Sequence, residues 1–432
     1  IPQFFRSYMV QQSSSPLIEA IGRRVYYGWV MVGMGFVGMF ASGVGQSFTV
    51  SVFVNPIIDD LGISRTSISS AYTLGTLTAA FGLTYLGRLI DRIGQRAMLV
   101  AVAFLLGVSA MLFSTVGNLV ALYAAFTAVR IFGQGAMMLT STNLVSQWFV
   151  RRRGFALSLT NLGFAVASAI IPPAVQLLSD QQGWRIAWIW LGLATWVLVI
   201  PSALLLVRNR PEALGLMPDG AGGATAQADV PPDEGGSWTV GEALRTRQFW
   251  IMAVSIAIPS MLITGMVFHQ ISYLRGMGLS AQAAANVFTV TAVSMVAFGL
   301  VFGYLLDRYQ TQRVVALGML CMTASMYTML AADTPLLAAL YGVVFGTAIG
   351  AMMMMGSYVW PRYFGRQHLG GVQGVAATIT ITGASLGPLP FGLAFDLLGG
   401  YGEAVLLLSL LPLLAAIAVW LTPPPLKPAL RP

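Results

Sequence analysis

The chain has 432 residues, of which 56% are hydrophobic and only 9% are charged, and its formal net charge is +8. Soluble domains carry roughly 25% charged residues, so this composition excludes a water-soluble globular fold. The basic residues stand in small groups between apolar runs, so the positive charge indicates no nucleic-acid partner. One cysteine (Cys321) and two histidines far apart in sequence (His269 and His368) predict no disulfide framework, no metal site and no cofactor.

The apolar pattern predicts an all-α membrane protein. Runs of about 20 apolar residues, each long enough to cross a ~30 Å hydrocarbon core as a helix, recur along the chain. The first segment, residues 1–28, lacks the basic start and short apolar core of a signal peptide, so it is predicted to be a cytoplasmic arm. Twelve transmembrane helices are expected after it, at 29–52, 67–86, 97–117, 119–147, 154–178, 185–207, 249–274, 282–306, 313–332, 334–361, 369–395 and 401–421.

The distribution of basic residues predicts the orientation. With the N-terminus in the cytoplasm, 19 of the 23 lysines and arginines fall on the inner side. Three arginines then fall in outer loops (Arg65, Arg185 and Arg275), and Arg130 lies within a span. The positive-inside rule therefore places both termini in the cytoplasm.

A Pro-, Gly-, Ala- and Asp-rich stretch near the middle of the chain predicts a division into two halves. The expected parts are an N-terminal half at 29–207, a cytoplasmic linker at 208–248, a C-terminal half at 249–421 and a cytoplasmic tail at 422–432. Gly-Arg-Leu-Ile-Asp-Arg at 87–92 returns as Gly-Tyr-Leu-Leu-Asp-Arg at 303–308, an offset of 216, and Trp148-Phe149 returns as Tyr363-Phe364, an offset of 215. Two landmarks thus indicate one duplication and two pseudo-symmetric six-helix halves, a layout of secondary transporters.

Prolines predict local irregularities in two of the helices. Pro172-Pro173 in the fifth helix and Gly383-Ala-Ser-Leu-Gly-Pro388 in the eleventh are expected to bend their helices, because proline removes a backbone donor and clashes one turn back.

The segment at 87–96 resembles the loop between helices 2 and 3 that marks the major facilitator superfamily. This resemblance implies the major facilitator fold and transport without covalent chemistry, so no enzyme is expected. An acidic side chain between arginines can form charge-assisted hydrogen bonds, so the loop could latch the halves on the cytoplasmic side. A plain positive-inside loop is the alternative. The residues assigned to this gate are Gly87, Arg88, Asp91, Arg92, Gly94, Arg96, Asp307 and Arg308.

Other motifs are similar to the bacterial monocarboxylate and oxalate-formate transporter branch. They are Trp-Phe-Val-Arg-Arg-Arg-Gly-Phe-Ala at 148–156 with Asn161 and Gly163, Tyr27-Gly28-Trp29, and the stretch 268–274. The resemblance implies a multi-pass protein of the bacterial inner membrane, acting as a monomer. Two features depart from the branch: Gly299 stands where an arginine is usual in helix 8, and helix 11 contains no basic residue. Drug antiporters resemble one another in a Gly-Pro motif in helix 5. Ile171 stands in the place of that glycine here, which argues against a drug antiporter.

Arg130 is the one charge well inside a predicted span. Such a residue costs roughly 2.5–3.5 kcal/mol at the centre of a helix, so it is expected to face a cavity or a partner. Gln134 follows it on the same helix face. The guanidinium suits bidentate capture of a carboxylate, while a packing or coupling role stays open as the alternative.

Further polar residues in the spans complete the candidate substrate site. His269 changes charge in the physiological pH range and could hydrogen-bond a carboxylate, or it could be structural. The other candidates, each of which could equally be a helix-packing residue, are Gln46, Asn143, Tyr273, Tyr341 and Tyr358. The run Met352 to Met355 is interpreted as packing, although flexible thioethers can also line a tolerant apolar cavity. No Asp or Glu lies securely within a span, which disfavours cationic substrates.

Together these features predict a secondary transporter that moves a small organic anion, similar to a monocarboxylate, by alternating access. Proton symport and anion exchange are both compatible with the sequence. The alternative is a carrier of a neutral or amphipathic compound. A non-transporting sensor would need a soluble module, which a linker of about 28 residues does not provide. The expected partners are the substrate, protons and the lipid bilayer.

Overall fold

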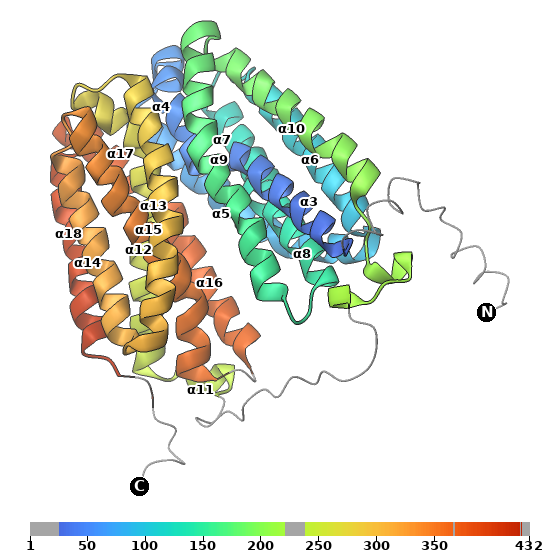
Figure 1. The fold of residues 1–432 in the computed structure, drawn as a ribbon. Helices are drawn as coiled ribbons and strands as arrows, with labels where there is room; N and C mark the ends of the chain where they lie inside the picture. Colours follow the sequence, from blue (N-terminus) through green and yellow to red (C-terminus); the bar gives the residue numbers. More distant parts are fainter. Residues whose placement is uncertain (1–25, 221–237, 366–367, 424, 426–432) are drawn as a thin grey trace.

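Long helices follow one another along the whole chain in the computed structural model, which describes residues 26–220, 238–365, 368–423 and 425 (Figure 1). The elements of the first half are α3 (Gly28–Ala41), η1 (Ser42–Gly45), α4 (Ser47–Leu61), α5 (Arg65–Ile93), α6 (Gln95–Phe113), α7 (Leu119–Val129), η2 (Arg130–Met137), α8 (Met138–Trp148), α9 (Arg153–Gln182) and α10 (Trp184–Leu206). The linker contributes η3 (Pro211–Leu214), η4 (Pro218–Gly220) and α11 (Val240–Leu244). The second half contains α12 (Arg247–Gly276), α13 (Ala281–Arg308), α14 (Thr311–Leu330), α15 (Pro335–Phe364), α16 (Leu369–Leu386), α17 (Pro388–Leu398) and α18 (Gly402–Trp420).

Short polar side chains start several of these helices by capping the free backbone N–H groups of the first turn. The Asn118 side chain accepts from Ala121 N at 2.8 Å at the start of α7. Ser280 and Thr334 do the same at the starts of α13 and α15. At the other end of α4, Gly62 adopts a left-handed conformation with φ +60°, which favours glycine and stops the helix.

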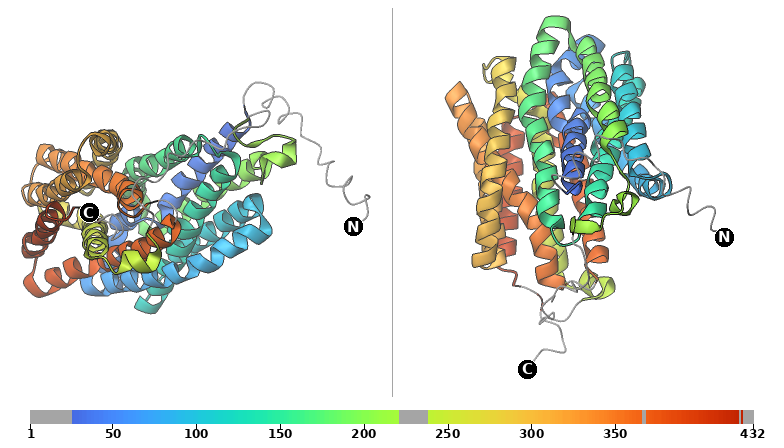
Figure 2. Two further views of the ribbon diagram at one scale, coloured as in Figure 1. Left: turned by 90° about the horizontal axis from the view of Figure 1, so that it is seen from below. Right: turned by 45° about the vertical axis from the view of Figure 1, so that its right-hand side comes forward.

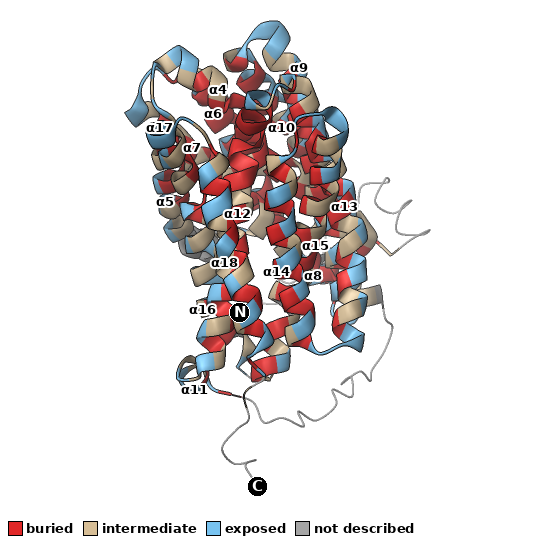
Figure 3. Ribbon diagram, turned by 90° about the vertical axis from the view of Figure 1, so that its left-hand side faces the viewer, coloured by how far each residue is buried: buried red, intermediate tan, exposed pale blue. Residues whose placement is uncertain are grey.

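Within the described residues, eleven helical segments are long and apolar enough to cross a membrane. The helix α5 is not among them because serines and threonines follow one another along its first half, but it brings the number of long helical segments there to twelve. Buried residues line the inside of the bundle and exposed residues lie on its outside (Figure 3). Large apolar side chains such as Phe81 and Leu300 are among the exposed residues. An apolar outer surface is what a hydrocarbon environment requires. The predicted all-α membrane fold is confirmed.

The predicted end of the first helix, at residue 52, was wrong. This helix runs from Gly28 to Leu61 with an interruption at η1, and Pro56 lies inside α4. Proline removes only its own backbone donor, so the helix continues beyond it when tertiary packing supports the turn. The helix α9 likewise continues as one helix through Pro172 and Pro173. The eleventh span, in contrast, is divided between α16 and α17 at Gly387.

The two groups of helices lie side by side, as Figure 1 and both views of Figure 2 show. We use "N-terminal half" for α3 to α10 and "C-terminal half" for α12 to α18. The main contacts between the halves are α9 with α13, α4 with α12, and α5 with α17. We call the end of the bundle with η4 and α11 the linker end, and the opposite end, with the loops after α4, α12 and α17, the far end.

Candidate functional site

The first transmembrane helix is interrupted near its middle. After α3 the chain forms the 3₁₀ turn η1, then Gln46 is extended with φ −92° and ψ 157°, and α4 begins at Ser47. Such a break releases backbone carbonyl groups from the hydrogen bonds of the helix. The hydroxyl of Thr49 donates to the Gly43 carbonyl at 2.7 Å. The carbonyl of Gly45 receives its partner from another helix.

The fourth transmembrane helix is irregular where it meets this break. Between α7 and α8 the residues Arg130–Met137 form a π-helical segment, η2. Gly133 of this segment lies against Gly45, because a Cβ placed on Gly45 would come within 2.2 Å of the Val129 carbonyl oxygen and 2.9 Å of Gly133 Cα. Only glycine allows two backbones to approach so closely. π-Helical segments are frequent at functional sites.

Arg130, the first residue of the π segment, is almost completely buried, with 3% of its surface exposed. Its Nη1 donates to the Gly45 carbonyl at 3.1 Å, and its Cζ lies 4.9 Å from the centroid of the Tyr72 ring. Its Nε is buried and has no hydrogen-bond partner among the described residues. Within this part of the chain the ion pair present joins Arg185 and Asp60, so Arg130 has no carboxylate partner there.

Arg130 and Gln134 line a cavity of about 560 Å³ on the N-terminal half, which we call the N lobe. The Oε1 atom of Gln134 is buried without a hydrogen-bond partner among the described residues. The guanidinium therefore has an amide oxygen of unmet hydrogen-bonding capacity four residues away. The N lobe is lined by Thr76, Ala79, Ala80, Arg130, Gln134, Gly135, Met138, Leu139, Thr142 and Ile381.

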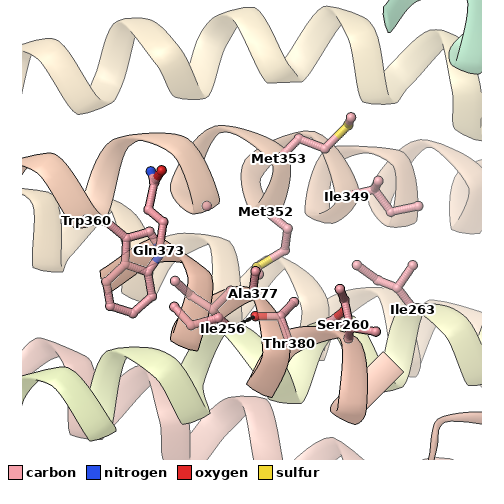
Figure 4. A pocket seen from close by; sticks show the side chains of 13 residues that line it. Ile256, Ser260, Ile263, Ile349, Met352, Met353, Trp360, Gln373, Ala377 and Thr380 are labelled. Atoms are coloured by element: carbon pink, nitrogen blue, oxygen red, sulfur yellow. Dashed lines mark hydrogen bonds between the residues drawn. The ribbon is translucent and has the colours of Figure 1, made fainter. Parts of the chain in front are cut away.

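A second cavity, of about 700 Å³, lies on the C-terminal half, and we call it the C lobe (Figure 4). Ile381 lines both lobes, so this one side chain borders both cavities. Trp360 and Gln373, which lie near the linker end of α15 and α16, also line the C lobe, so the cavity reaches toward that end. Its lining residues are Ile256, Ser260, Ile263, Ile349, Met352, Met353, Gly356, Trp360, Gln373, Ala376, Ala377, Thr380 and Ile381.

A cavity between two helical halves, lined by broken or irregular helices, is typical of secondary transporters. The sequence profile of the Major Facilitator Superfamily matches residues 35–290 and 267–432. The chain belongs to the major facilitator superfamily. The predicted family, which is a family of membrane transporters and not of enzymes, is confirmed.

Relatives within the superfamily include carriers of small anions. The oxalate:formate antiporter of Oxalobacter formigenes is 27% identical over 240 residues, which are 56% of this chain and 54% of the antiporter. The human monocarboxylate transporter 11 is 27% identical over 343 residues, which are 78% of this chain and 63% of that transporter. The matched part of the chain thus spans about half of the antiporter. The predicted resemblance to this branch is confirmed.

Solved structures of the superfamily have the same fold. A bacterial homolog of the human lysosomal transporter Spinster aligns with a TM-score of 0.70 and 15% identity, over 92% of this chain and 97% of that one. The nucleoside transporter NupG aligns with a TM-score of 0.71 and 15% identity, over 91% of this chain and 98% of that one. These likenesses establish the major facilitator fold.

At the far end, hydrogen bonds join the two halves of this superfamily member. The carboxylate of Asp396 in α17 accepts from the backbone N–H groups of Arg65 and Thr66 at 3.3 and 2.8 Å, so it caps α5 of the other half. The Arg65 guanidinium donates to Asn55 at 2.9 Å and to Ser272 at 3.1 Å. Ser272 itself donates to Asn55 at 2.7 Å, which joins α12 to α4.

His269 belongs to the same far-end region. Its Nε2 lies 3.0 Å from the Pro388 carbonyl oxygen and 3.3 Å from Ser69 Oγ of the other half, and its Nδ1 lies 3.1 Å from the Tyr401 hydroxyl. A carbonyl can only accept, so Nε2 carries the proton in the neutral ring and Nδ1 accepts from Tyr401. Burial raises the pKa of Tyr401 to about 12, so this hydroxyl keeps its proton at physiological pH. His269 thus contacts the interface between the halves and does not line either lobe.

The structure brings two of the predicted substrate residues together and separates the rest. Arg130 and Gln134 share the N lobe, but Gln46 is buried with its Nε2 on the Met138 sulfur at 3.3 Å. The remaining candidates lie outside the two lobes. Tyr341 donates to Gln270 Oε1 at 3.2 Å, the Tyr358 hydroxyl accepts from Arg362 at 3.1 Å, Tyr273 lies against the Tyr401 ring, and Asn143 is half-buried in α8.

The predicted gate is described only in part, because the side chains of Arg88 and Asp91 and the surroundings of Gly87 lie outside the described residues. Gly94 adopts φ +83°, which favours glycine, and ends α5 before Arg96. Arg96 N donates to the Asn209 side chain at 2.9 Å and its guanidinium contacts the Leu204 carbonyl. Of the remaining gate residues, Arg92 and Asp307 are exposed, and the Arg308 guanidinium lies over the Tyr304 ring. The contacts seen here join Arg96 to α10 and the start of the linker, and Arg308 to its own helix, so none of them reaches the other half.

Several residues of the site carry no distinctive pattern in the sequence. Tyr72 and Thr76 both lie near Arg130 in the structure. They are four residues apart on α5, so they share one helix face, and this spacing is the one feature of the sequence that could have indicated them. Met352, for which packing and cavity lining both stayed open, lines the C lobe. Trp360, Gln373 and Thr380 join it there from α15 and α16.

Proposed function

We propose that this transporter carries a small organic anion, similar to a monocarboxylate, through the two lobes by alternating access. The observation that supports this most directly is Arg130, a buried cation that lines the N lobe without a carboxylate partner in the described part of the chain. Placing an unpaired charge in the middle of a membrane protein is costly, so the position is best explained by an anion that enters and leaves. A substrate carboxylate would supply the missing counter-charge.

The environment of Arg130 explains how such an anion would be held. Nη1 is engaged by the Gly45 carbonyl, which fixes the plane of the guanidinium, and Tyr72 lies beneath it. The unpartnered Nε belongs to the edge that binds carboxylates side-on. In this proposal Arg130 would combine a structural contact at the helix break with a donor for the substrate.

Alternating access would follow from the different ends of the bundle. The cross-half bonds through Asp396, Arg65 and Ser272 close the far end, whereas the C lobe reaches toward the linker end. We infer that the linker end faces the cytoplasm of a bacterial inner membrane, because the positive-inside rule places 19 of the 23 basic residues on that side. The conformation is then the inward-facing state of a carrier whose halves rock against each other. We propose that the halves are residues 29–207 and 249–421, and that the segment at 87–96 is the gate of the linker end.

The coupling reaction is proposed to be anion exchange or proton symport. The two differ in one measurement, because exchange requires a second anion on the opposite side of the vesicle membrane and symport requires a proton gradient. Uptake of a labelled carboxylate into proteoliposomes, either preloaded with unlabelled anion or energised by an inward proton gradient, separates them.

The test of the site is Arg130→Gln, which removes the charge but keeps a donor that can reach toward the Gly45 carbonyl. We expect this variant to remain folded but to lose the stabilisation that a bound carboxylate gives to the wild type, since ligands stabilise the native state by mass action. Thermal unfolding with and without butyrate, together with uptake into proteoliposomes, measures this. Arg185→Gln, which removes an arginine that lies outside both lobes, is the matched control. Undiminished uptake and an unchanged butyrate response in Arg130→Gln would remove Arg130 from the site.

A second candidate function, transport of a neutral amphipathic compound, is favoured by the apolar character of the C lobe around Met352 and Trp360. It predicts binding that is insensitive to Arg130→Gln and sensitive to Met352→Gln. The carboxamide that corresponds to each carboxylate is the direct probe, because it keeps the shape and removes the charge.

A further inference from the structure

We propose that the C lobe selects the body of the substrate, so that this carrier prefers anions with one carboxylate and an apolar body over dianions and over hydroxyl-rich acids. The inference rests on the proposed function of Arg130 and adds a specificity role for Met352, Trp360 and Ile381. These three residues line the C lobe, whereas Arg130 lines the N lobe.

The C lobe offers a predominantly apolar surface. Nine of its thirteen lining residues are aliphatic, thioether or aromatic, and no charged residue is among the thirteen. Figure 4 shows Met352 in the middle of this wall near Ala377, with Trp360 beside Gln373 on one side and Ile349 and Ile263 on the other. The hydroxyl of Thr380 donates to the Ala376 carbonyl at 2.9 Å, so its proton is already used within the helix. Apolar ligand atoms would find contacts over most of this surface, and the remaining side chains that could bond a polar atom are those of Ser260 and Gln373 and the indole of Trp360.

The position of Ile381 determines how a substrate would lie. Since Ile381 lines both lobes, a molecule whose carboxylate reaches Arg130 would pass this side chain and extend into the C lobe. The lobes have volumes of about 560 and 700 Å³, and cavities of roughly 300–1,000 Å³ hold ligands of drug size. An anion of two or three heavy atoms would leave the C lobe unfilled. The cavity is therefore suited to a carboxylate with a longer apolar body.

The wall would also reject a second charge. A second carboxylate on the far side of the ligand would lie against Met352 and the neighbouring isoleucines, where the lining provides no cation. Transfer of an unpaired charge or an unbonded hydroxyl to an apolar surface is unfavourable. The absence of a basic residue from the described part of α16 and α17 has the same consequence, because no second cation comes from that span. Discrimination would thus come from the partner groups that the C lobe lacks.

The test uses purified full-length protein and carboxylates of increasing length, from acetate through butyrate to hexanoate, with binding measured by isothermal titration calorimetry. We expect the affinity to rise about fourfold for each added methylene, from the usual transfer free energy of a buried CH₂ group. Two six-carbon probes keep the length of hexanoate. Adipate adds a second carboxylate and 6-hydroxyhexanoate adds a hydroxyl, and both are expected to bind at least about tenfold more weakly than hexanoate.

Variants connect this selectivity to the wall. Met352→Gln is expected to flatten the dependence of affinity on chain length, and Met352→Leu, which keeps an apolar side chain of similar volume, is expected to preserve that dependence. Equal binding of acetate and hexanoate, or of hexanoate and adipate, would overturn the selectivity while leaving the anion site in place. Hexanamide binding as tightly as hexanoate, or carboxylate binding that survives Arg130→Gln, would instead overturn the proposed function.

Discussion

The fourth helix of the N-terminal half and its counterpart α15 show how one duplicated element has diverged. Trp148-Phe149 and Tyr363-Phe364 are related by an offset of 215. With this offset, Phe345 is the residue of the second half that corresponds to Arg130. Phe345 is buried and stacks on Tyr341 with ring centroids 5.4 Å apart, whereas Arg130 lines the N lobe. The N-terminal helix contains the π segment, while α15 is a regular helix from Pro335 to Phe364.

Glycines mediate close packing in both halves, but between different helices. In the N-terminal half Gly133 lies against Gly45 of the broken first helix. In the C-terminal half Gly346 and Gly350 lie against the backbone of α13, where an added Cβ would come within 2.4 Å of the Thr291 carbonyl oxygen and 2.5 Å of the Met295 carbonyl oxygen. In the proposed site, one half would supply the charge and a broken backbone, and the other would supply a regular apolar wall. A single central site can be assembled from such unequal halves.

Gly45→Ala is expected to have the largest effect, because it attacks the contact that distinguishes the N-terminal half. The new Cβ would lie 2.2 Å from the Val129 carbonyl oxygen, a backbone atom that cannot move without displacing η2. Overpacking of this kind costs about 1–3 kcal/mol, and it would also displace the carbonyl that holds Arg130. We expect a fall of several degrees in the melting temperature of the purified protein and loss of carboxylate uptake in proteoliposomes.

Two further glycine variants separate the effects of the two halves. Gly33→Ala is the matched control, since an added Cβ at Gly33 of α3 has no atom within 4 Å and should change neither property. Gly346→Ala should lower the melting temperature of the protein without ligand. The increase in melting temperature on adding a carboxylate should stay the same, because the substitution disturbs α15 and not Arg130. A Gly45→Ala protein as stable and active as the wild type would show that the approach of the two backbones is not required.

Much of the fold follows from the sequence because the physical signal is local. Apolar runs long enough to cross a membrane predict helices wherever they occur, and eleven of the twelve predicted helices overlap the eleven candidate spans. The predicted helix 67–86 corresponds to α5, whose interior-facing serines and threonines lower its hydropathy. Arg130 was recognisable for the same reason, since a lone charge in an apolar run stands out without any knowledge of its neighbours.

The rest of the site depends on contacts between residues far apart in sequence. The break at η1 and the π segment at η2 arise where Gly45 contacts Gly133. The sequence of either segment alone does not predict that its helix is irregular there. His269 was grouped with the substrate residues because of its chemistry, but its partners Tyr401 and Pro388 lie more than 100 residues away and place it at the far-end interface. Its predicted contact with substrate stays a prediction. Composition indicates which side chains are unusual, and only packing determines what they face.

Asp396→Ala is expected to have an intermediate effect. It should change the fraction of molecules in which the far end is open. Asp396 caps α5 of the other half through the backbone N–H groups of Arg65 and Thr66. Loss of a helix cap costs about 1 kcal/mol, which corresponds to an approximately fivefold change in a two-state population. We expect the far end to open about five times more often.

A cysteine at position 69 reports this opening. Ser69 is completely buried and lies against Gly392 of α17, so a Ser69→Cys thiol becomes accessible when α17 separates from α5. The labelling rate with a membrane-impermeant maleimide, in a Cys321→Ser background, should rise about fivefold in the Asp396→Ala protein. Asp396→Asn, which keeps one acceptor oxygen, should give a smaller increase. An unchanged labelling rate in both variants would mean that the cap does not hold the far end closed.

Asp219→Asn is expected to have the smallest effect, and it tests how the linker is attached to the N-terminal half. The Asp219 carboxylate accepts from the backbone N–H groups of Val150, Arg151 and Arg152 at 2.9, 2.8 and 3.2 Å, just before α9. Burial raises the pKa of this carboxyl, but the three hydrogen bonds outweigh burial and hold the pKa below its usual range. The residue has φ +60°, a conformation that asparagine also tolerates, so the substitution mainly removes charge.

The lowered pKa determines how the effect depends on pH. A carboxyl whose pKa is lower in the folded than in the unfolded state contributes stability above the unfolded value of about 3.9, and this contribution is lost as the pH falls through the folded value. At pH 7 we therefore expect Asp219→Asn to lower the melting temperature by about 1–2 °C, with carboxylate uptake unchanged. The difference from the wild type should shrink progressively below pH 4 as Asp219 itself becomes protonated. A difference that persists undiminished at pH 3 would assign the attachment to the shape of the side chain and the backbone turn, and not to the charge of Asp219.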